Sequence, residues 1–147
     1  MKLLSPFLLA LVGVAAITSS SLRAADQPKP PATGEASKSY RNVAVEEFDK
    51  MRKGTNVVVL DVRTAKEFAD GHLANAVNLD FYAPDFALQL GKLDKSKTYL
   101  VHCAAGGRSA KACNTMTQLN FTSAVNLEGG YKAWVKAEKP VVTTSTK

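Results

Sequence analysis

Short apolar runs alternate with segments of helical spacing along the chain, and this order limits the folds that it can adopt. The apolar runs fall at 57–60, which ends in Asp61, and at 76–79, 98–102 and 123–127. Segments with helical spacing fall at 45–52, 64–69, 84–90 and 107–119, and a last helix carries Trp134. Fully apolar strands separated by helices are buried on both faces. The pattern therefore predicts an α/β fold, with a largely parallel sheet covered by helices on both faces.

The start of the chain has the layout of a secretory signal peptide. Residues 1–24 contain Lys2, an apolar run at 3–17 and small residues before a cleavage point that we place after Ala24. The apolar run is shorter than the roughly 20 residues that cross a bilayer, and Pro6 interrupts it, which favours a cleaved leader over an anchor. We therefore expect a periplasmic or secreted protein, without stable membrane association after cleavage.

The chain of 147 residues leaves room for one ordinary domain, which we expect over residues 40–142. Residues 25–39 are rich in proline and small residues and are predicted to be a flexible linker, and 143–147 a disordered tail. Removal of the leader lowers the net charge from +6 to +4. The lysines alternate with acids and form no basic stripe, so nucleic-acid binding is not expected, although the positive balance favours small anions.

The two cysteines, Cys103 and Cys113, are predicted to stay free. If the helix after Cys103 starts near Gly107, Cys113 lies roughly 9 Å along its axis. A disulfide allows only about 7 Å between Cα atoms. A thiol that stays free in an oxidising compartment needs a chemical reason. We expect that reason at Cys103 and interpret Cys113 as a core residue.

The loop that follows the 98–102 run is almost without side chains. It reads Cys103-Ala104-Ala105-Gly106-Gly107-Arg108-Ser109. Loops of this kind let backbone N–H groups turn inward around an anion at a helix N-terminus, which would lower the pKa of Cys103 below its free value of about 8.5. Arg108 would attract an incoming oxyanion, and Ser109 would cap the loop or donate to the thiolate. The pattern favours Cys103 as a nucleophile on a surface-facing loop.

Three motifs resemble the rhodanese family and follow the family's order over most of residues 40–142. The loop at 103–109 resembles the family's C-x-x-G-x-R-S loop. Residues 61–73, D-V-R-T-A-K-E-F-A-D-G-H-L, resemble its D-V-R-x-x-x-E-[FY]-x-x-G-H-[IL] signature, and Gly129-Gly130 with Trp134 resembles its closing G-G-x-x-x-W segment. The resemblance implies a rhodanese-like α/β fold, with a five-stranded, mostly parallel sheet and helices on both faces.

The resemblance also implies a sulfurtransferase. Such an enzyme moves a sulfane sulfur from thiosulfate, or from a persulfide or polysulfide donor, to a thiol or cyanide through a persulfide on the catalytic Cys103. Its partners would be small sulfur-containing anions or persulfides and a thiol acceptor, and no metal or other cofactor is required. The substrate-binding residues would be Ala104, Ala105, Gly106, Gly107, Arg108 and Ser109.

The loop also suggests which substrates it admits. The span from Cys103 to Arg108 has the family's length for sulfur transfer, one residue shorter than in related phosphatases. Efficient thiosulfate enzymes of the family often have a basic residue just after the cysteine, whereas this chain has Ala104 and Ala105. Weak thiosulfate binding is therefore expected. Two alternatives stay open: a non-enzymatic rhodanese-like sulfur carrier or interaction module, and a cysteine-based phosphatase or arsenate reductase, which the short loop disfavours.

The supporting residues are expected to be Asp61, Arg63 and Glu67. Arg63 and Glu67 are four residues apart, so we predict an ion pair across the start of the 64–69 helix that holds the Asp61 loop near the site. His72 is interpreted as a buried, hydrogen-bonded residue rather than a base. His102 precedes the cysteine on a strand and should point to the opposite face of the sheet. Two lone histidines and two cysteines at these spacings predict no metal site.

Overall fold

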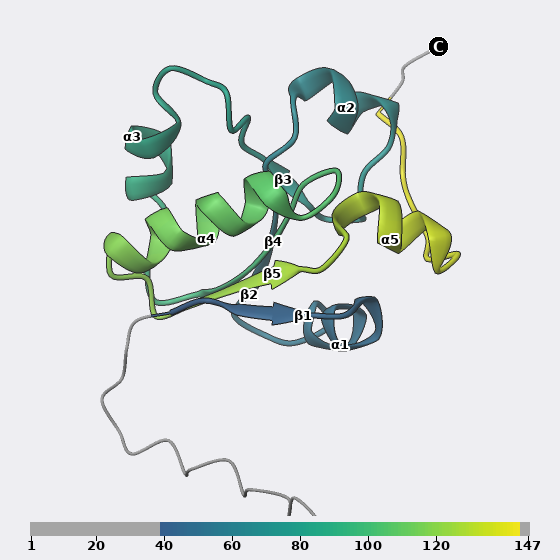
Figure 1. Ribbon diagram of the computed structural model, residues 1–147, viewed down its shortest axis with the longest axis horizontal. Helices are drawn as coiled ribbons and strands as arrows, with labels where there is room; N and C mark the ends of the chain where they lie inside the picture. Colours follow the sequence, from purple (N-terminus) through teal and green to yellow (C-terminus); the bar gives the residue numbers. More distant parts are fainter. Residues whose placement is uncertain (1–38, 145–147) are drawn as a thin grey trace, which may run out of the picture. The chain divides into compact units, whose positions relative to one another are not determined.

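The computed structural model describes residues 39–144, in which strands and helices alternate (Figure 1). The strands are β1 (Arg41–Val43), β2 (Val57–Asp61), β3 (Val77–Asn78), β4 (Thr98–His102) and β5 (Ser123–Leu127). The helices are α1 (Val45–Met51), α2 (Ala65–Asp70), α3 (Phe86–Gly91), α4 (Gly107–Gln118) and α5 (Gly130–Lys136). The expected leader, nearly all of the expected linker and residues 145–147 lie outside the described residues. Between residues 39 and 144, no helix is long and apolar enough to cross a membrane.

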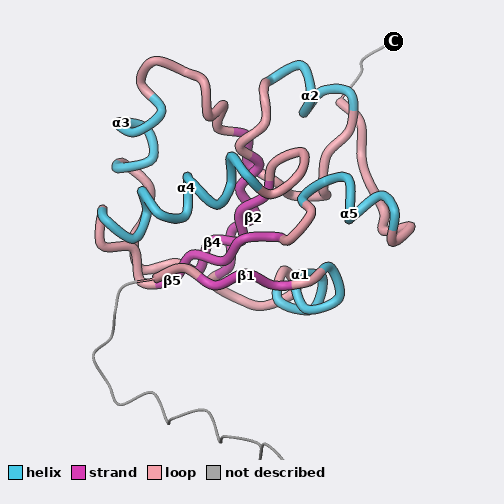
Figure 2. The backbone as a smooth tube through the Cα atoms, viewed as in Figure 1, coloured by secondary structure: helices cyan, strands magenta, loops and turns pink. Residues whose placement is uncertain are grey.

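The strands form one sheet in the order β1-β5-β4-β2-β3, and each of its strand pairs is parallel. The predicted α/β fold with a five-stranded sheet is therefore confirmed. β4 lies at the centre, between β2 and β5, and Asp61 at the end of β2 stands opposite His102 at the end of β4. Because parallel strands end at the same edge, the loops that follow β2, β4 and β5 meet there. Figure 2 shows α3 and α4 above the strands and α1 beside the end of β1 at the lower right.

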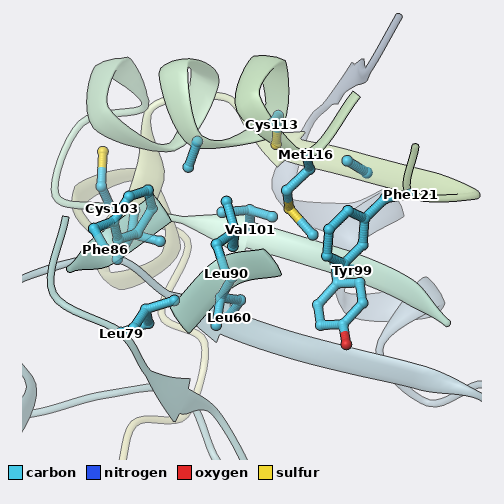
Figure 3. Packing of buried hydrophobic residues seen from close by; sticks show 13 residues of the cluster. Leu60, Leu79, Phe86, Leu90, Tyr99, Val101, Cys103, Cys113, Met116 and Phe121 are labelled. Carbon is cyan, nitrogen blue, oxygen red and sulfur yellow. The ribbon is translucent and has the colours of Figure 1, made fainter. Parts of the chain in front are cut away.

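Two apolar clusters fill the space between the sheet and its helices. On one face, α3 and α4 cover the sheet, and Val101 of β4 packs among their buried residues (Figure 3). On the other face, Phe48 of α1 and Trp134 of α5 meet edge to face, with ring centroids 6.2 Å apart. Trp134 is fully buried and its indole N–H donates to the carbonyl of Pro140 at 3.0 Å. The helices thus cover both faces, as expected, and Trp134 anchors α5 in the core.

Element boundaries differ from the sequence pattern where local hydrogen bonds decide them. α2 begins at Ala65 because Thr64 is its N-cap, with the hydroxyl accepting the N–H of Glu67 at 3.2 Å. α3 begins at Phe86 because a turn precedes it, in which the Phe86 N–H donates to the carbonyl of Ala83 at 3.0 Å. The run at 76–79 forms only the short strand β3. β1 lies at the sheet edge, pairs only with β5 and buries only Val43, so it carries no apolar run. The pattern of apolar runs therefore did not predict this strand.

Candidate active site

Cys103 lies where the central strand β4 ends and α4 begins. Its Sγ atom accepts the backbone N–H of Gly106 at 3.1 Å. The Ser109 hydroxyl oxygen lies 3.4 Å from Sγ and 3.1 Å from the Gly106 carbonyl oxygen, so its single proton can serve either acceptor. Gly106 adopts φ 96°, a backbone conformation that glycine tolerates and that lets the loop curl around the sulfur. The loop predicted from the sequence therefore does gather hydrogen-bond donors around Cys103.

The two cysteines differ in acidity because their surroundings differ. Burial works to raise the pKa of Cys103, but hydrogen bonds from the Ser109 hydroxyl and from the N–H groups of Ser109, Ala105 and Gly106 outweigh it, so this pKa falls below its ordinary value. Burial and the nearby charge of Cys103 raise the pKa of Cys113 to about 12. Both thiols are free, as predicted, and Cys113 is a core residue of α4. Cys103 is thus the thiol that ionises more readily.

The N-terminus of α5 holds the loop in its curled shape. The N–H groups of Tyr131 and Lys132 donate to the carbonyls of Cys103 and Ala104, at 2.7 and 3.0 Å. Because these carbonyls turn toward α5, the N–H groups that follow in the loop are free to face the sulfur. Gly130 adopts φ 58°, and a Cβ atom there would collide with the carbonyl oxygen of Cys103 and lie 2.8 Å from the Ala105 nitrogen. The turn before α5 is therefore part of the site.

This role of Gly130 and Tyr131 was not predicted from the sequence, in which the glycine pair was assigned only to a family motif. The available signal was the glycine pair itself, directly after an apolar strand whose end meets the cysteine loop. A pair of glycines at such a point indicates a close approach between two backbones.

Cys103 is buried, which contradicts the expectation that its loop faces the surface. Only 2% of the residue's surface is exposed. The cysteine belongs to the cluster under α3 and α4, and Figure 3 shows it beside Phe86, with its sulfur directed away from the packed side chains. The physical reason is that a loop curled tightly enough to aim N–H groups at the sulfur also covers it. Little of the sulfur is open to solvent in this state.

Arg108 and Glu67 form an ion pair that the sequence analysis did not predict. The two terminal nitrogens of Arg108 donate to the two carboxylate oxygens of Glu67, each at 2.9 Å. Hydrogen bonding from Arg108, opposed by partial burial and aided by Thr64, lowers the pKa of Glu67 to about 2. The predicted pair between Arg63 and Glu67 is wrong. Arg63 precedes the N-cap of α2, so the two side chains do not share a helical surface.

Arg63 instead pairs with Asp61 beneath the site. Its Nη2 atom lies 2.6 Å from Asp61 Oδ2 and also donates to the carbonyl of Gly71 at 2.7 Å. The ring of Tyr131 lies over the guanidinium, with the Arg63 Cζ atom 3.9 Å from the ring centroid. Asp61 and Arg63 are both buried. The Arg63–Asp61 pair therefore supports Tyr131, whose backbone N–H donates to the carbonyl of Cys103.

The two histidines are structural. His102 is fully buried and lies on the face opposite Cys103, as predicted. The centroid of its ring is 6.4 Å from that of the Phe48 ring. Burial lowers the pKa of His102 to about 4, although Asp61, 3.6 Å away, opposes this, so the ring is neutral at pH 7. His72 is buried and stacks on Phe68, with Nδ1 2.9 Å from the Phe68 carbonyl oxygen. In the described part of the chain, no group of three or more potential ligating side chains could hold a metal ion.

The fold and the site define a class: a layered α/β domain with a cysteine cradled by backbone donors at the end of its central strand. Residues 44–137 match the Rhodanese-like domain family, and the chain belongs to this family. The crystal structure of a rhodanese-related protein from Thermoplasma volcanium is 33% identical, with a TM-score of 0.63, and the match covers 70% of this chain and 98% of that one. The similarity in fold and sequence extends over most of the described residues.

Two curated relatives come from Arabidopsis thaliana. Thiosulfate sulfurtransferase 16, chloroplastic, is 36% identical over 91 residues, which cover 55% of this chain and 76% of that protein. Protein HIGH ARSENIC CONTENT 1, mitochondrial, is 38% identical over 88 residues, which cover 53% of this chain and only 52% of that protein, so the chain spans about half of its length. The first of these relatives is named a sulfurtransferase, which supports a rhodanese-type enzyme at the level of the family.

Proposed function

We propose that the protein transfers sulfane sulfur and carries it as a persulfide on Cys103. The observation that supports this most directly is the set of donors at Sγ, the Gly106 N–H at 3.1 Å and the Ser109 hydroxyl at 3.4 Å. These donors favour the thiolate, which is the form of cysteine that attacks sulfur. The same donors can stabilise the negative charge on the outer sulfur of a persulfide. The cradle therefore suits both states of a sulfur carrier.

The reaction has two half-reactions. In the first, the Cys103 thiolate attacks the outer sulfur of thiosulfate, a new S–S bond forms at Sγ, and the electron pair of the broken S–S bond leaves with sulfite. With a persulfide donor, that electron pair leaves with the donor's thiol sulfur instead. In the second, a thiol or cyanide attacks the outer sulfur of the enzyme persulfide, and the electron pair returns to Sγ. Donor and acceptor thus react in turn, as in other covalent mechanisms.

The neighbouring residues have distinct tasks in this proposal. The N–H groups of Ala105 and Gly106 hold the charge on sulfur, and Gly107 begins the helix that Ser109 continues. Arg108 would attract an anionic donor only when released from Glu67, which engages its guanidinium in this structure. Asp61 and Arg63 act at a distance by supporting the loop through Tyr131.

The test is to mix the purified protein with thiosulfate and follow sulfite release together with the intact mass. We expect one equivalent of sulfite and a mass increase of one sulfur atom, both reversed by cyanide or a thiol. Cys103→Ser should show neither change while keeping the wild-type melting temperature within a few degrees, and Cys113→Ala is the matched control that should react. Retained turnover in Cys103→Ser would exclude this nucleophile. A persulfide that no acceptor removes would favour the carrier over the enzyme.

A further inference from the structure

The Glu67–Arg108 pair joins two elements that are far apart in sequence. Glu67 lies on α2 and Arg108 in the first turn of α4, and both bonds of the pair are 2.9 Å. Both side chains are partly buried: the exposed fraction is 36% for Glu67 and 18% for Arg108. The N–H and hydroxyl of Thr64 also donate to Glu67 Oε2, at 3.0 and 3.1 Å. The carboxylate is thus held from both sides, unlike a mobile surface pair.

The pair leaves the cysteine loop without net side-chain charge. Arg108 is the only charged residue between positions 103 and 109. Glu67 neutralises it, so only N–H groups remain to balance negative charge at the sulfur. A thiosulfate ion would bring two negative charges next to the Cys103 thiolate. A persulfide brings at most one charge, as R–S–S⁻, and none as R–S–SH, so its repulsion at the site is weaker than that of thiosulfate.

We propose that Glu67 is a specificity-determining residue that directs this site toward persulfide donors and away from the thiosulfate dianion. To pair with thiosulfate, Arg108 must leave Glu67, which strands a partly buried carboxylate. A persulfide needs no such exchange. The Cys103 thiolate bonds to the outer sulfur, the donor's S–S bond breaks, and the electron pair leaves on the donor as a thiolate. This inference rests on the proposed sulfur transfer and names its donor class.

The test compares kcat/KM for thiosulfate and for the persulfide of 2-mercaptoethanol, whose remaining group is uncharged. Glu67→Gln removes the charge while its side-chain carbonyl can still accept from Thr64. We expect the kcat/KM of this variant for thiosulfate to rise about tenfold, mainly because KM falls. Its kcat/KM for the persulfide should stay within about twofold of the wild-type value. Glu67→Asp, which keeps the charge, should keep the wild-type preference even if it lowers the melting temperature.

Asp70→Asn is the matched control for the general loss of one negative charge. Asp70 is an exposed carboxylate on the same helix and pairs with Lys66 at 3.1 Å, not with Arg108. The Asp70→Asn variant should have the same preference between the two donors as the wild type. If Glu67→Gln leaves the preference unchanged, or Asp70→Asn shifts it equally, the role of Glu67 is refuted while sulfur transfer stands. If the wild type forms no persulfide with either donor, the proposed function itself fails.

Discussion

Replacing Gly130 by alanine should disturb the cysteine loop from a distance in the sequence. The residue adopts φ 58°, and its added Cβ would collide with the carbonyl oxygen of Cys103 and lie 2.9 Å from the carbonyl carbon of Ala104. These neighbours are backbone atoms, which cannot rotate aside as the end of a flexible side chain can. The loop or the start of α5 must therefore move.

The magnitude follows from two contributions. An alanine in the left-handed region costs about 1–2 kcal/mol. Displacement of the loop weakens the hydrogen bonds from Tyr131 and Lys132 to the Cys103 and Ala104 carbonyls, each worth about 0.5–1.5 kcal/mol. We expect Gly130→Ala to lower the free energy of unfolding by about 2–5 kcal/mol, which a domain of ordinary stability survives in most cases. The pKa of Cys103 should rise in the folded variant, because the loop N–H groups no longer converge on the sulfur.

Urea denaturation gives the stability, and the pH dependence of Cys103 alkylation by iodoacetamide gives the pKa. Gly107→Ala is the matched control, because Gly107 opens α4 in the cysteine loop itself and a Cβ atom there meets nothing within 4 Å. It should be neutral or stabilise by about 0.4–1 kcal/mol, with the alkylation profile unchanged. Wild-type stability and reactivity in Gly130→Ala would refute the claim that this turn shapes the cradle.

Three further outcomes are expected. Ser109→Ala should raise the pKa of Cys103, since it removes the Ser109 hydroxyl that lowers this pKa and keeps the backbone N–H; an unshifted pH midpoint of alkylation would contradict this. Cys113→Ala should cost about 1–2 kcal/mol in urea denaturation and leave sulfur transfer intact, and lost transfer at an unchanged melting temperature would instead indicate a resolving thiol. Because the folded-state pKa of Glu67 is about 2 against an ordinary 4.5, its stabilisation is complete above pH 4.5 and is lost as the pH falls toward 2. The wild-type melting temperature should therefore fall more steeply across that window than that of Glu67→Gln, and parallel curves would count against the pair.

Sequence patterns alone predicted the fold class and the position of the reactive loop. The runs at 98–102 and 123–127 coincide with β4 and β5, because strands buried on both faces are mostly apolar. The small residues around Gly106 predicted a backbone cradle for the same local reason, since only such residues let N–H groups converge. Periodicity failed at β1, where a three-residue edge strand with one buried side chain leaves no apolar signal.

The partners of the charged residues and glycines depend on how separate segments of the chain pack together. Spacing along α2 suggested Arg63 for Glu67, but the capping geometry at Thr64 places Arg63 outside the helix, and Arg108 reaches Glu67 from α4 instead. The requirement for Gly130 and the burial of Cys103 likewise arise where separate segments pack against each other. Local sequence encodes backbone conformation and burial pattern, whereas an ion pair or a close backbone approach depends on which ends of the sheet the chain brings together.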